Sequence, residues 1–167
     1  RMVKRSLDSG DLLTVDCYLG KQRMLELGIN SNKVIVFPWG VDLTIFNKEK
    51  IHSPTKLFSQ DKKVVICNRA FYPLYGIDYL IRSFRKVISS VPEARLILFN
   101  YTPRYHEPKT KDYSLLIKDL GLGEYIKIME PVNQIDMASY LKSSDLYVTT
   151  SFSDGTSVSL LEAMACG

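Results

Sequence analysis

The sequence has 167 residues, which suits one domain or slightly more. Hydrophobic residues make up 46% of it, so the chain can bury a core and is not expected to be disordered. The net charge of +4 is modest, and no basic tract alternates with aromatic residues, so the composition does not indicate a nucleic-acid partner. Neither a signal peptide nor a long apolar span is visible.

Three cysteines and two histidines are the residues most typical of metal sites. Cys17, Cys67 and Cys166 are isolated, so they provide neither a disulfide framework nor a zinc-binding spacing, and a reducing cytoplasm is the expected compartment. His52 and His106 lie in polar, proline-containing stretches, where we expect exposed side chains without a metal-binding role.

The N-terminal part of the chain is expected to alternate between helix and strand. Gly28 is typical of the end of a helix, here the one expected over residues 18–27. Pro38 ends the strand expected over residues 33–37. Residues 47–61 are polar and rich in turn formers, which indicates a surface crossover. The elements expected here are helices over residues 1–9 and 18–27 and strands over residues 11–15 and 33–37.

From residue 63 onward, apolar β-branched stretches alternate with amphipathic ones. This pattern predicts an α/β fold: a Rossmann-like parallel sheet with right-handed crossovers and helices on both faces. The strands are expected over residues 63–67, 94–99, 125–129 and 145–150, and the helices over residues 76–89, 111–120, 134–142 and 157–166.

The last strand and the last helix meet in a tight turn at Asp154 and Gly155. The start of a helix leaves backbone N–H groups unpaired at the positive end of its dipole, which predicts a phosphate site. Glu162 lies among apolar neighbours and needs a partner, which paired sugar hydroxyls would supply; a capped helix with an ordinary exposed Glu is the alternative. The core-facing side of this helix is expected to consist of Leu160, Leu161 and Met164.

Ligands of parallel sheets bind beyond the carboxyl ends of the strands. Arg69 enters such a loop directly from the first strand of this sheet, although a surface Arg paired with an acid is the alternative. Tyr101, Tyr105 and His106 form an aromatic loop after the second strand, where contact with a ligand stays open. The loops at these ends cover residues 68–76, 100–110, 130–134 and 150–157.

The C-terminal stretch resembles the E-x7-E motif of retaining glycosyltransferases of family GT4, which have the GT-B fold. Asp154 stands where the family has the first Glu, and Glu162 stands at the second. Leu160–Gly167 closely matches the family's Leu-Leu-Glu-Ala-Met-Ala-x-Gly, whereas Thr156 and Ser157 replace its Phe-Gly. The chain is therefore expected to be the C-terminal half of a GT-B fold.

Two further stretches resemble the same family. Pro38–Asp42, followed by Phe46, is similar to the interdomain linker Pro-Asn-Gly-Val-Asp-x-x-x-Phe, with Trp39 at the Asn position. Arg69 and Gly76 match the pattern Gly-Arg-x5-Lys-Gly-x-Asp, whose Arg and Lys bind the donor diphosphate.

Tyr75 occupies the position of that Lys. A Tyr hydroxyl donates one hydrogen bond but brings no charge at neutral pH, so one of the two expected positive charges is missing. Three outcomes stay open. Arg69 and the helix N-terminus are enough to bind the diphosphate, a Lys from elsewhere supplies the missing charge, or the activity is altered.

The resemblance implies a site for a nucleotide-sugar donor without a metal or other cofactor. Arg69 and Asp154 are the implied catalytic residues, the first for the leaving diphosphate and the second for the sugar hydroxyls. Glu162 would bind the ribose. Pro131 and Val132 resemble the loop that packs on the nucleobase, although a plain turn is the alternative. The other donor-binding residues implied are Asn68, Tyr75, Gly76, Ser151, Gly155, Thr156, Ser157 and Val158.

The implied reaction is transfer of a sugar from a nucleotide sugar to an acceptor hydroxyl with retention of configuration, in polysaccharide or glycoconjugate synthesis. Residues 1–42 would be a remnant of the N-terminal domain with the linker, and residues 43–167 the donor-binding domain, truncated at its C-terminus. The chain is therefore expected to be an inactive fragment of a longer protein.

The acceptor would be a glycan or lipid-linked sugar, bound through the missing N-terminal domain, and no nucleic acid is involved. The protein would be cytoplasmic, with peripheral contact at the inner face of the membrane left open. Two alternatives to a transferase remain: a GT-B-fold nucleotide-sugar epimerase and a non-catalytic nucleotide-binding homologue.

Overall fold

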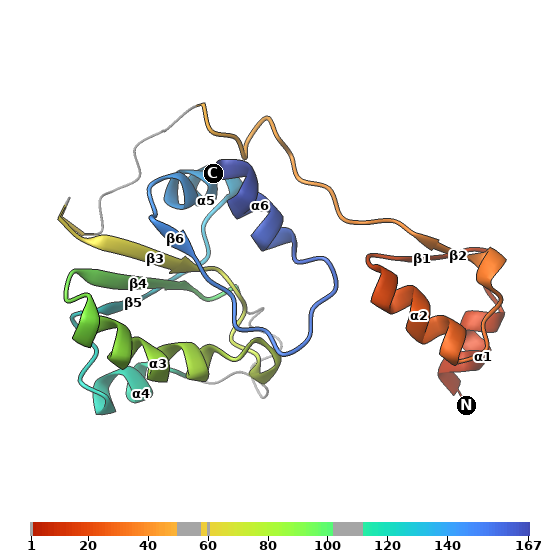
Figure 1. The fold of residues 1–167 in the computed structure, drawn as a ribbon, viewed down its shortest axis with the longest axis horizontal. Coiled ribbons are helices and arrows are strands. Elements are labelled where there is room, and N and C mark those ends of the chain that lie inside the picture. Colours follow the sequence, from red (N-terminus) through yellow and green to blue (C-terminus); the bar gives the residue numbers. More distant parts are fainter. Residues whose placement is uncertain (1, 50–57, 60, 102–111) are drawn as a thin grey trace. The chain divides into compact units, whose positions relative to one another are not determined.

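The computed structural model describes residues 2–49, 58–59, 61–101 and 112–167 (Figure 1). His52, Tyr105 and His106, most of the crossover expected over residues 47–61, and most of the aromatic loop after residue 101 lie outside them. The chain forms two compact units. The N-terminal unit consists of Arg1–Gly40 with Asp154–Val158, and the C-terminal unit consists of Val41–Ser153 with Ser159–Gly167.

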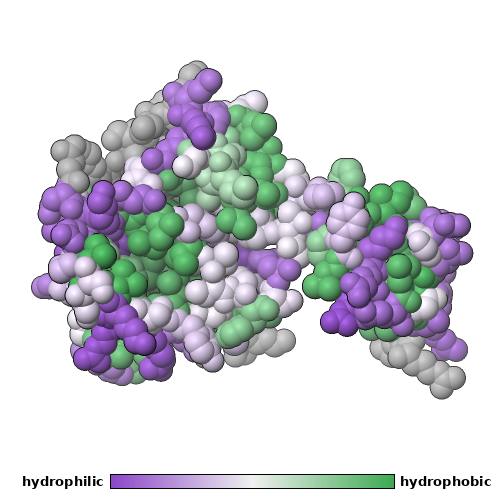
Figure 2. All heavy atoms as spheres, in the orientation of Figure 1, coloured by the Kyte–Doolittle hydropathy of each residue, from purple (hydrophilic) through white to green (hydrophobic). Residues whose placement is uncertain are grey.

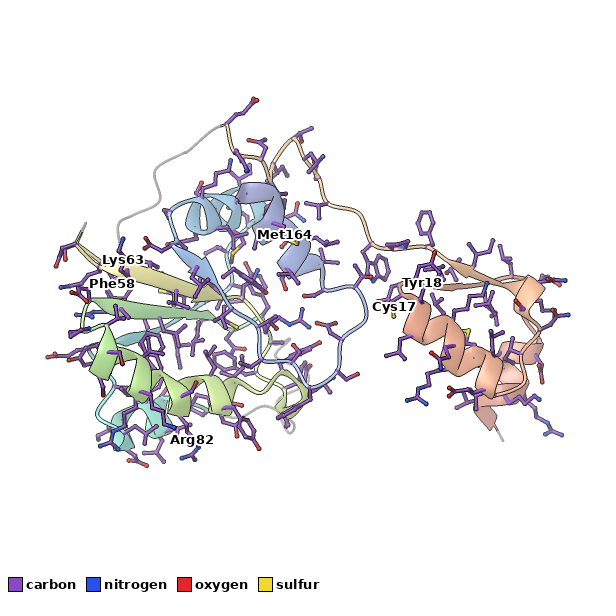
Figure 3. All side chains as sticks on the ribbon, in the orientation of Figure 1. Cys17, Tyr18, Phe58, Lys63, Arg82 and Met164 are labelled. Carbon is purple, nitrogen blue, oxygen red and sulfur yellow. The ribbon has the colours of Figure 1, made fainter. Side chains whose placement is uncertain are left out.

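The N-terminal unit contains a short two-stranded parallel sheet with helices. Its elements are α1 (Met2–Asp8), β1 (Leu13–Val15), α2 (Tyr18–Glu26), the 3-10 helix η1 (Ser31–Lys33) and β2 (Val34–Val36). Cys17 caps α2, because its Sγ accepts a hydrogen bond of 3.4 Å from the N–H of Gly20 (Figure 3). Ile29 and Val34 are the buried hydrophobic residues among its described side chains.

Large hydrophobic side chains remain exposed on this unit, and Figure 2 shows green, hydrophobic residues at its surface. A two-stranded sheet with two short helices offers little surface against which to bury them. The exposed set comprises Val3, Leu12, Tyr18, Leu19, Leu25, Leu27, Ile35, Phe37 and Trp39.

The C-terminal unit is built on a four-stranded parallel sheet with the strand order β5-β4-β3-β6. The strands are β3 (Lys63–Cys67), β4 (Ala94–Phe99), β5 (Ile126–Met129) and β6 (Leu146–Tyr147). The helices between them are η2 (Pro73–Tyr75), α3 (Ile77–Ser90), α4 (Ser114–Asp119), α5 (Gln134–Lys142) and α6 (Val158–Cys166). All three strand pairs are parallel, so the predicted α/β, Rossmann-like fold class is confirmed.

Two layers of helices cover this sheet, α3 and α4 on one face and α5 and α6 on the other (Figure 1). The alternation of side chains along β4 divides the core between the two faces. Leu96 and Leu98 pack with α3 and α4, whereas Ile97 and Phe99 pack with α5 and α6.

The strand expected over residues 145–150 is shorter than predicted, because β6 has only the two residues Leu146 and Tyr147. Its start is anchored to β3 by Asp145, whose carboxylate accepts hydrogen bonds of 2.8 Å from Val64 N–H and 3.2 Å from Lys63 Nζ (Figure 3). The N–H of Val64, followed by Lys63, lowers the pKa of Asp145. Beyond residue 148 the chain leaves the ladder and bonds instead to the loop after β3.

The predicted core-facing side of α6 is wrong for Leu160 and Met164, whereas Leu161 is half-buried. Met164 is 66% exposed and Leu160 is 39% exposed, whereas Ser159 and Cys166 are buried (Figure 3). Ala163 also packs against the core, so the buried side carries small residues at i, i+4 and i+7 spacing.

None of the helices in the described residues has the length and apolar character needed to span a lipid bilayer.

Candidate functional site

The carboxyl end of the sheet has a topological switch point between β3 and β6. From β3 the chain passes through α3 to β4 on one side, whereas β6 pairs with the other side of β3. In open α/β sheets, ligands bind beyond the strands at such a point. Asn68 and Arg69 follow β3 directly, so both residues lie at this position.

The loops that follow β3 and β6 are joined by hydrogen bonds. Thr150 Oγ1 donates to the carbonyl oxygens of Tyr75 and Gly76 at 2.9 and 3.0 Å. The N–H of Phe152 donates to the carbonyl oxygen of Leu74 at 2.9 Å. The conformation of the loop after β3 is therefore fixed by a segment about 75 positions further along the chain.

Gly76 is required by the geometry of this junction. It ends η2 and precedes α3 with a φ of 61°, in the left-handed region. A Cβ at this position would lie 2.5 Å from the carbonyl oxygen of Thr150. Only glycine allows the two loops to approach this closely.

Arg69 contacts both Tyr75 and Ser159. Its Cζ lies 4.1 Å from the centroid of the Tyr75 ring, and its Nη1 donates a hydrogen bond of 3.1 Å to Ser159 Oγ. The same Oγ accepts a hydrogen bond of 2.9 Å from the hydroxyl of Tyr147. Burial raises the pKa of Tyr147 to about 12, so this phenol is protonated at neutral pH. These four side chains bring together β3, η2, β6 and the first turn of α6.

Asn68 carries an acceptor that the described residues leave without a partner. The residue is 9% exposed, and its Oδ1 has no hydrogen-bond partner among them. A buried acceptor of this kind costs free energy until a donor reaches it. Phosphate oxygens only accept hydrogen bonds, so a ligand hydroxyl or amide is the group that suits Asn68.

Glu162 is a half-buried carboxylate on α6, and burial raises its pKa. Its charge also contributes to raising the pKa of Tyr101 and of Tyr147, in both cases after the larger effect of burial. Glu162 is therefore within electrostatic reach of the residues that follow β4 and form β6. An acid whose pKa is raised by burial is a common feature of ligand sites.

Pro131 and Val132 lie in the loop after β5, and this loop is held by Tyr101. The Tyr101 hydroxyl donates to the carbonyl oxygen of Val132 at 2.8 Å and accepts from its N–H at 3.2 Å. Ser151, in the loop after β6, has its Oγ 3.0 Å from Oγ1 of Thr149. The loops after all four strands thus carry polar contacts at the same edge of the sheet.

The remaining predicted site residues, Asp154–Val158, belong to the N-terminal unit. There the N–H of Thr156 donates to Oδ2 of Asp16 at 2.9 Å, and Thr156 Oγ1 donates to the carbonyl oxygen of Asp16 at 2.6 Å. The Thr156 N–H is the main cause of the lowered pKa of Asp16. A backbone donor predicted to bind phosphate therefore binds a carboxylate in this structure.

Tyr147 and Ser159 were not predicted as site residues. A Ser three positions before Glu162 lies on the same side of the helix, and that spacing was the available signal for Ser159. Tyr147 gave no such signal, because a Tyr in a short strand fits an ordinary core. Among the described residues, no group of three or more His, Cys, Asp or Glu could hold a metal ion.

The profile of the family "Glycosyl transferases group 1" matches residues 47–167. The chain is 23% identical over 164 residues to D-inositol 3-phosphate glycosyltransferase of Mycolicibacterium smegmatis, covering 96% of the chain and 37% of that protein. It is 29% identical over 145 residues to a GDP-mannose-dependent monoacylated alpha-(1-6)-phosphatidylinositol monomannoside mannosyltransferase of Corynebacterium glutamicum, covering 78% of the chain and 35% of that enzyme. The chain thus spans well under half the length of these curated relatives.

Solved structures show the same fold. Anabaena HepE in complex with UDP and glucose superimposes with a TM-score of 0.83 at 20% identity, over 99% of this chain and 45% of that protein. Sucrose-phosphate synthase of Thermosynechococcus elongatus superimposes with a TM-score of 0.77 at 18% identity, over 99% of this chain and 41% of that enzyme.

Proposed function

Because the chain belongs to the group 1 glycosyl transferases, we propose that it carries the donor-binding part of an enzyme that transfers a sugar from a nucleotide sugar to an acceptor hydroxyl. The observation that carries the proposal is Arg69 at the carboxyl end of β3, beside the buried acceptor of Asn68. The Arg69 cation suits the diphosphate of a nucleotide sugar, and the Asn68 acceptor suits one of its hydroxyls.

Each site residue has a role in this proposal. Arg69 stabilises the negative charge that develops as the diphosphate leaves. The N–H groups at residues 156–158 assist it, and the N–H of Thr156 exchanges the Asp16 carboxylate for the diphosphate when the donor binds. Asp154 and Asn68 bind sugar hydroxyls, and Glu162 binds the ribose. The loop of Pro131 and Val132 packs on the base. The other donor contacts come from Ser151, Gly155, Thr156, Ser157 and Val158, with Gly76 shaping the loop.

The resemblance and the relatives support the proposed donor class and reaction course. HepE binds UDP, UDP and glucose, or UDP-glucose, and the C. glutamicum relative is GDP-mannose-dependent, so a nucleoside diphosphate sugar is the proposed donor class. Transfer proceeds with retention and needs no metal, because Arg69 and backbone amides hold the diphosphate. The product belongs to polysaccharide or glycoconjugate synthesis.

Residues 43–167 form the proposed donor-binding domain, and residues 1–42 belong to the preceding domain and its linker. The acceptor, a glycan or lipid-linked sugar, binds to that preceding domain. The free cysteines suit a reducing cytoplasm, and the enzyme contacts the membrane peripherally if its acceptor is lipid-linked.

The test is calorimetric binding of UDP, GDP and ADP to the full-length protein, followed by product analysis with the matching sugar nucleotide. Arg69→Ala should lower kcat/KM by about 10²–10³, the cost of losing one key donor to a developing oxyanion. Arg82→Ala is the matched control, because it removes the same charge from the exposed side of α3 (Figure 3). Failure of all three nucleotides to bind the wild type would refute the proposal.

A further inference from the structure

Arg69 is contacted on its face and on its edge by residues of this chain. The Tyr75 ring covers the face, with 4.1 Å between its centroid and the guanidinium carbon, and Ser159 Oγ accepts from the edge at 3.1 Å. We propose that Tyr75 is a positioning residue that holds Arg69 in the orientation that binds the donor diphosphate, rather than a donor to the diphosphate itself. This inference rests on the proposed function.

The Tyr75 ring is itself fixed. It packs against the hydrophobic core beneath α3, and its ring lies 6.2 Å from that of Tyr72 in an edge-on arrangement. Its backbone is held at both ends, because its N–H donates to the carbonyl oxygen of Tyr72 at 3.0 Å and its own carbonyl accepts from Thr150. A ring held in this way is a rigid surface on which a guanidinium can rest.

Stacking leaves the donors of a guanidinium accessible. The cation is attracted to the negative face of an aromatic ring, while the five N–H groups lie in the guanidinium plane and point away from the ring axis. In Arg69, Nη1 also donates to Ser159 Oγ and Nε is buried, so the outer edge of the guanidinium plane is the part that suits phosphate oxygens. An ammonium at position 75 could not provide this support, because it would bring a second positive charge next to the first.

The edge contact is also held by a second residue. Tyr147 donates to Ser159 Oγ at 2.9 Å, and burial raises its pKa to about 12, further from neutral pH. Ser159 is 9% exposed, so water competes little for its hydroxyl. Tyr75 and Ser159 thus restrict two different rotations of the Arg69 side chain, which lowers the entropy that it loses on binding a ligand.

The experiment compares nucleotide and nucleoside affinities in the full-length protein. Calorimetry first selects which of UDP, GDP and ADP binds the wild type, and the corresponding nucleoside serves as the ligand without phosphates. The variants are Tyr75→Leu, which removes the ring, Tyr75→Phe, which removes only the hydroxyl, and Ser159→Ala. Each is also combined with Arg69→Ala in a double-mutant cycle.

We expect Tyr75→Leu to weaken nucleoside diphosphate binding by about 2- to 30-fold, the range set by loss of one cation–π contact. Tyr75→Phe should weaken it less, because the ring remains. Nucleoside affinity should not change in either variant, which also shows that the protein is folded. In the Arg69→Ala background, loss of the ring or of the Ser159 hydroxyl should have no further effect.

Two results overturn the inference while leaving the proposed function intact. The first is an equal loss in Tyr75→Phe and Tyr75→Leu, which would assign the contact to the hydroxyl. The second is a loss of nucleoside diphosphate affinity in Tyr75→Leu that is equally large in the Arg69→Ala background. If Tyr75→Leu does not fold, Tyr75→Phe decides, because a loss of affinity in Tyr75→Phe that persists in the Arg69→Ala background would assign the contact to the hydroxyl and overturn the inference. If the wild type binds none of the three nucleotides, the proposed function falls, and the inference falls with it.

Discussion

Glu162 allows a test in which ligand affinity and stability change in opposite directions. Its carboxylate is half-buried on α6, and burial raises its pKa above the ordinary value of 4.5. Glu162→Gln keeps the shape of the side chain and removes the charge. If the carboxylate binds the ribose hydroxyls, the variant loses a charge-assisted hydrogen bond, which costs about 1.5–3 kcal/mol. Nucleotide affinity should therefore fall by about 10- to 150-fold.

The stability of the ligand-free protein should change the other way. Between pH 4.5 and the raised pKa of Glu162, the folded state binds more protons than the unfolded state. The free energy of unfolding of the wild type therefore falls as the pH rises through this window, and the deficit remains at neutral pH. Glu162→Gln lacks this titration, so it should be at least as stable as the wild type at neutral pH.

The assays are calorimetry with the nucleoside diphosphate that binds best, and urea unfolding of ligand-free protein between pH 4 and pH 8. Glu124→Gln is the matched control, because Glu124 is exposed before β5 at the opposite end of the strands. Unchanged nucleotide affinity in Glu162→Gln would refute its assignment to the ribose. A pH dependence of stability identical to that of the wild type would refute the role of its burial.

Two further changes test the loops around the site. Gly76→Ala should destabilise the protein by about 2–5 kcal/mol, because a left-handed conformation and a contact of 2.5 Å with Thr150 both oppose the Cβ. Gly121→Ala is its control in urea unfolding, because Gly121 has a φ of 69° but open space around an added Cβ. An equal fall in the free energy of unfolding in both variants would refute the contribution of the contact with Thr150. Tyr101→Phe should lower the free energy of unfolding by about 1–3 kcal/mol by removing two hydrogen bonds to the loop after β5. Tyr140→Phe is its control, because Tyr140 also packs against Phe99 of β4, while its hydroxyl bonds to none of the described residues. Hydrogen exchange in the loop after β5 should become faster only in the Tyr101 variant.

The sequence predicted the C-terminal sheet well because the relevant signals are local. Apolar β-branched runs and amphipathic stretches fix which segments become strands and helices, and parallel order follows from their alternation. The position of Arg69 could be predicted in the same way, because a residue that follows a strand lies at its carboxyl end. No tertiary contact was needed for either conclusion.

The predictions that failed or were missed depend on tertiary contacts. The buried side of α6 carries Ser159, whose hydroxyl bonds to Arg69 and Tyr147, rather than Leu160, and these partners are distant in the sequence. The stacking of Tyr75 on Arg69 could not be predicted, because it requires the turn that Gly76 makes against a distant loop. Motif spacing indicated that Tyr75 and Arg69 belong to one site but not that they touch.

The short β6 ladder has a consequence for the order in which the C-terminal unit assembles and opens. β6 is joined to β3 by two residue pairs, whereas β3 and β4 share five. Its first contact closes a loop of 81 positions between Val64 and Asp145, so it forms after the local pairings that lead from β3 to β5. We therefore expect the strand that carries Tyr147 to be the last to join the sheet and the first to detach. The proposed donor, held by residues after both strands, would oppose that detachment, so we expect local opening of β6 to become rarer when the donor is bound.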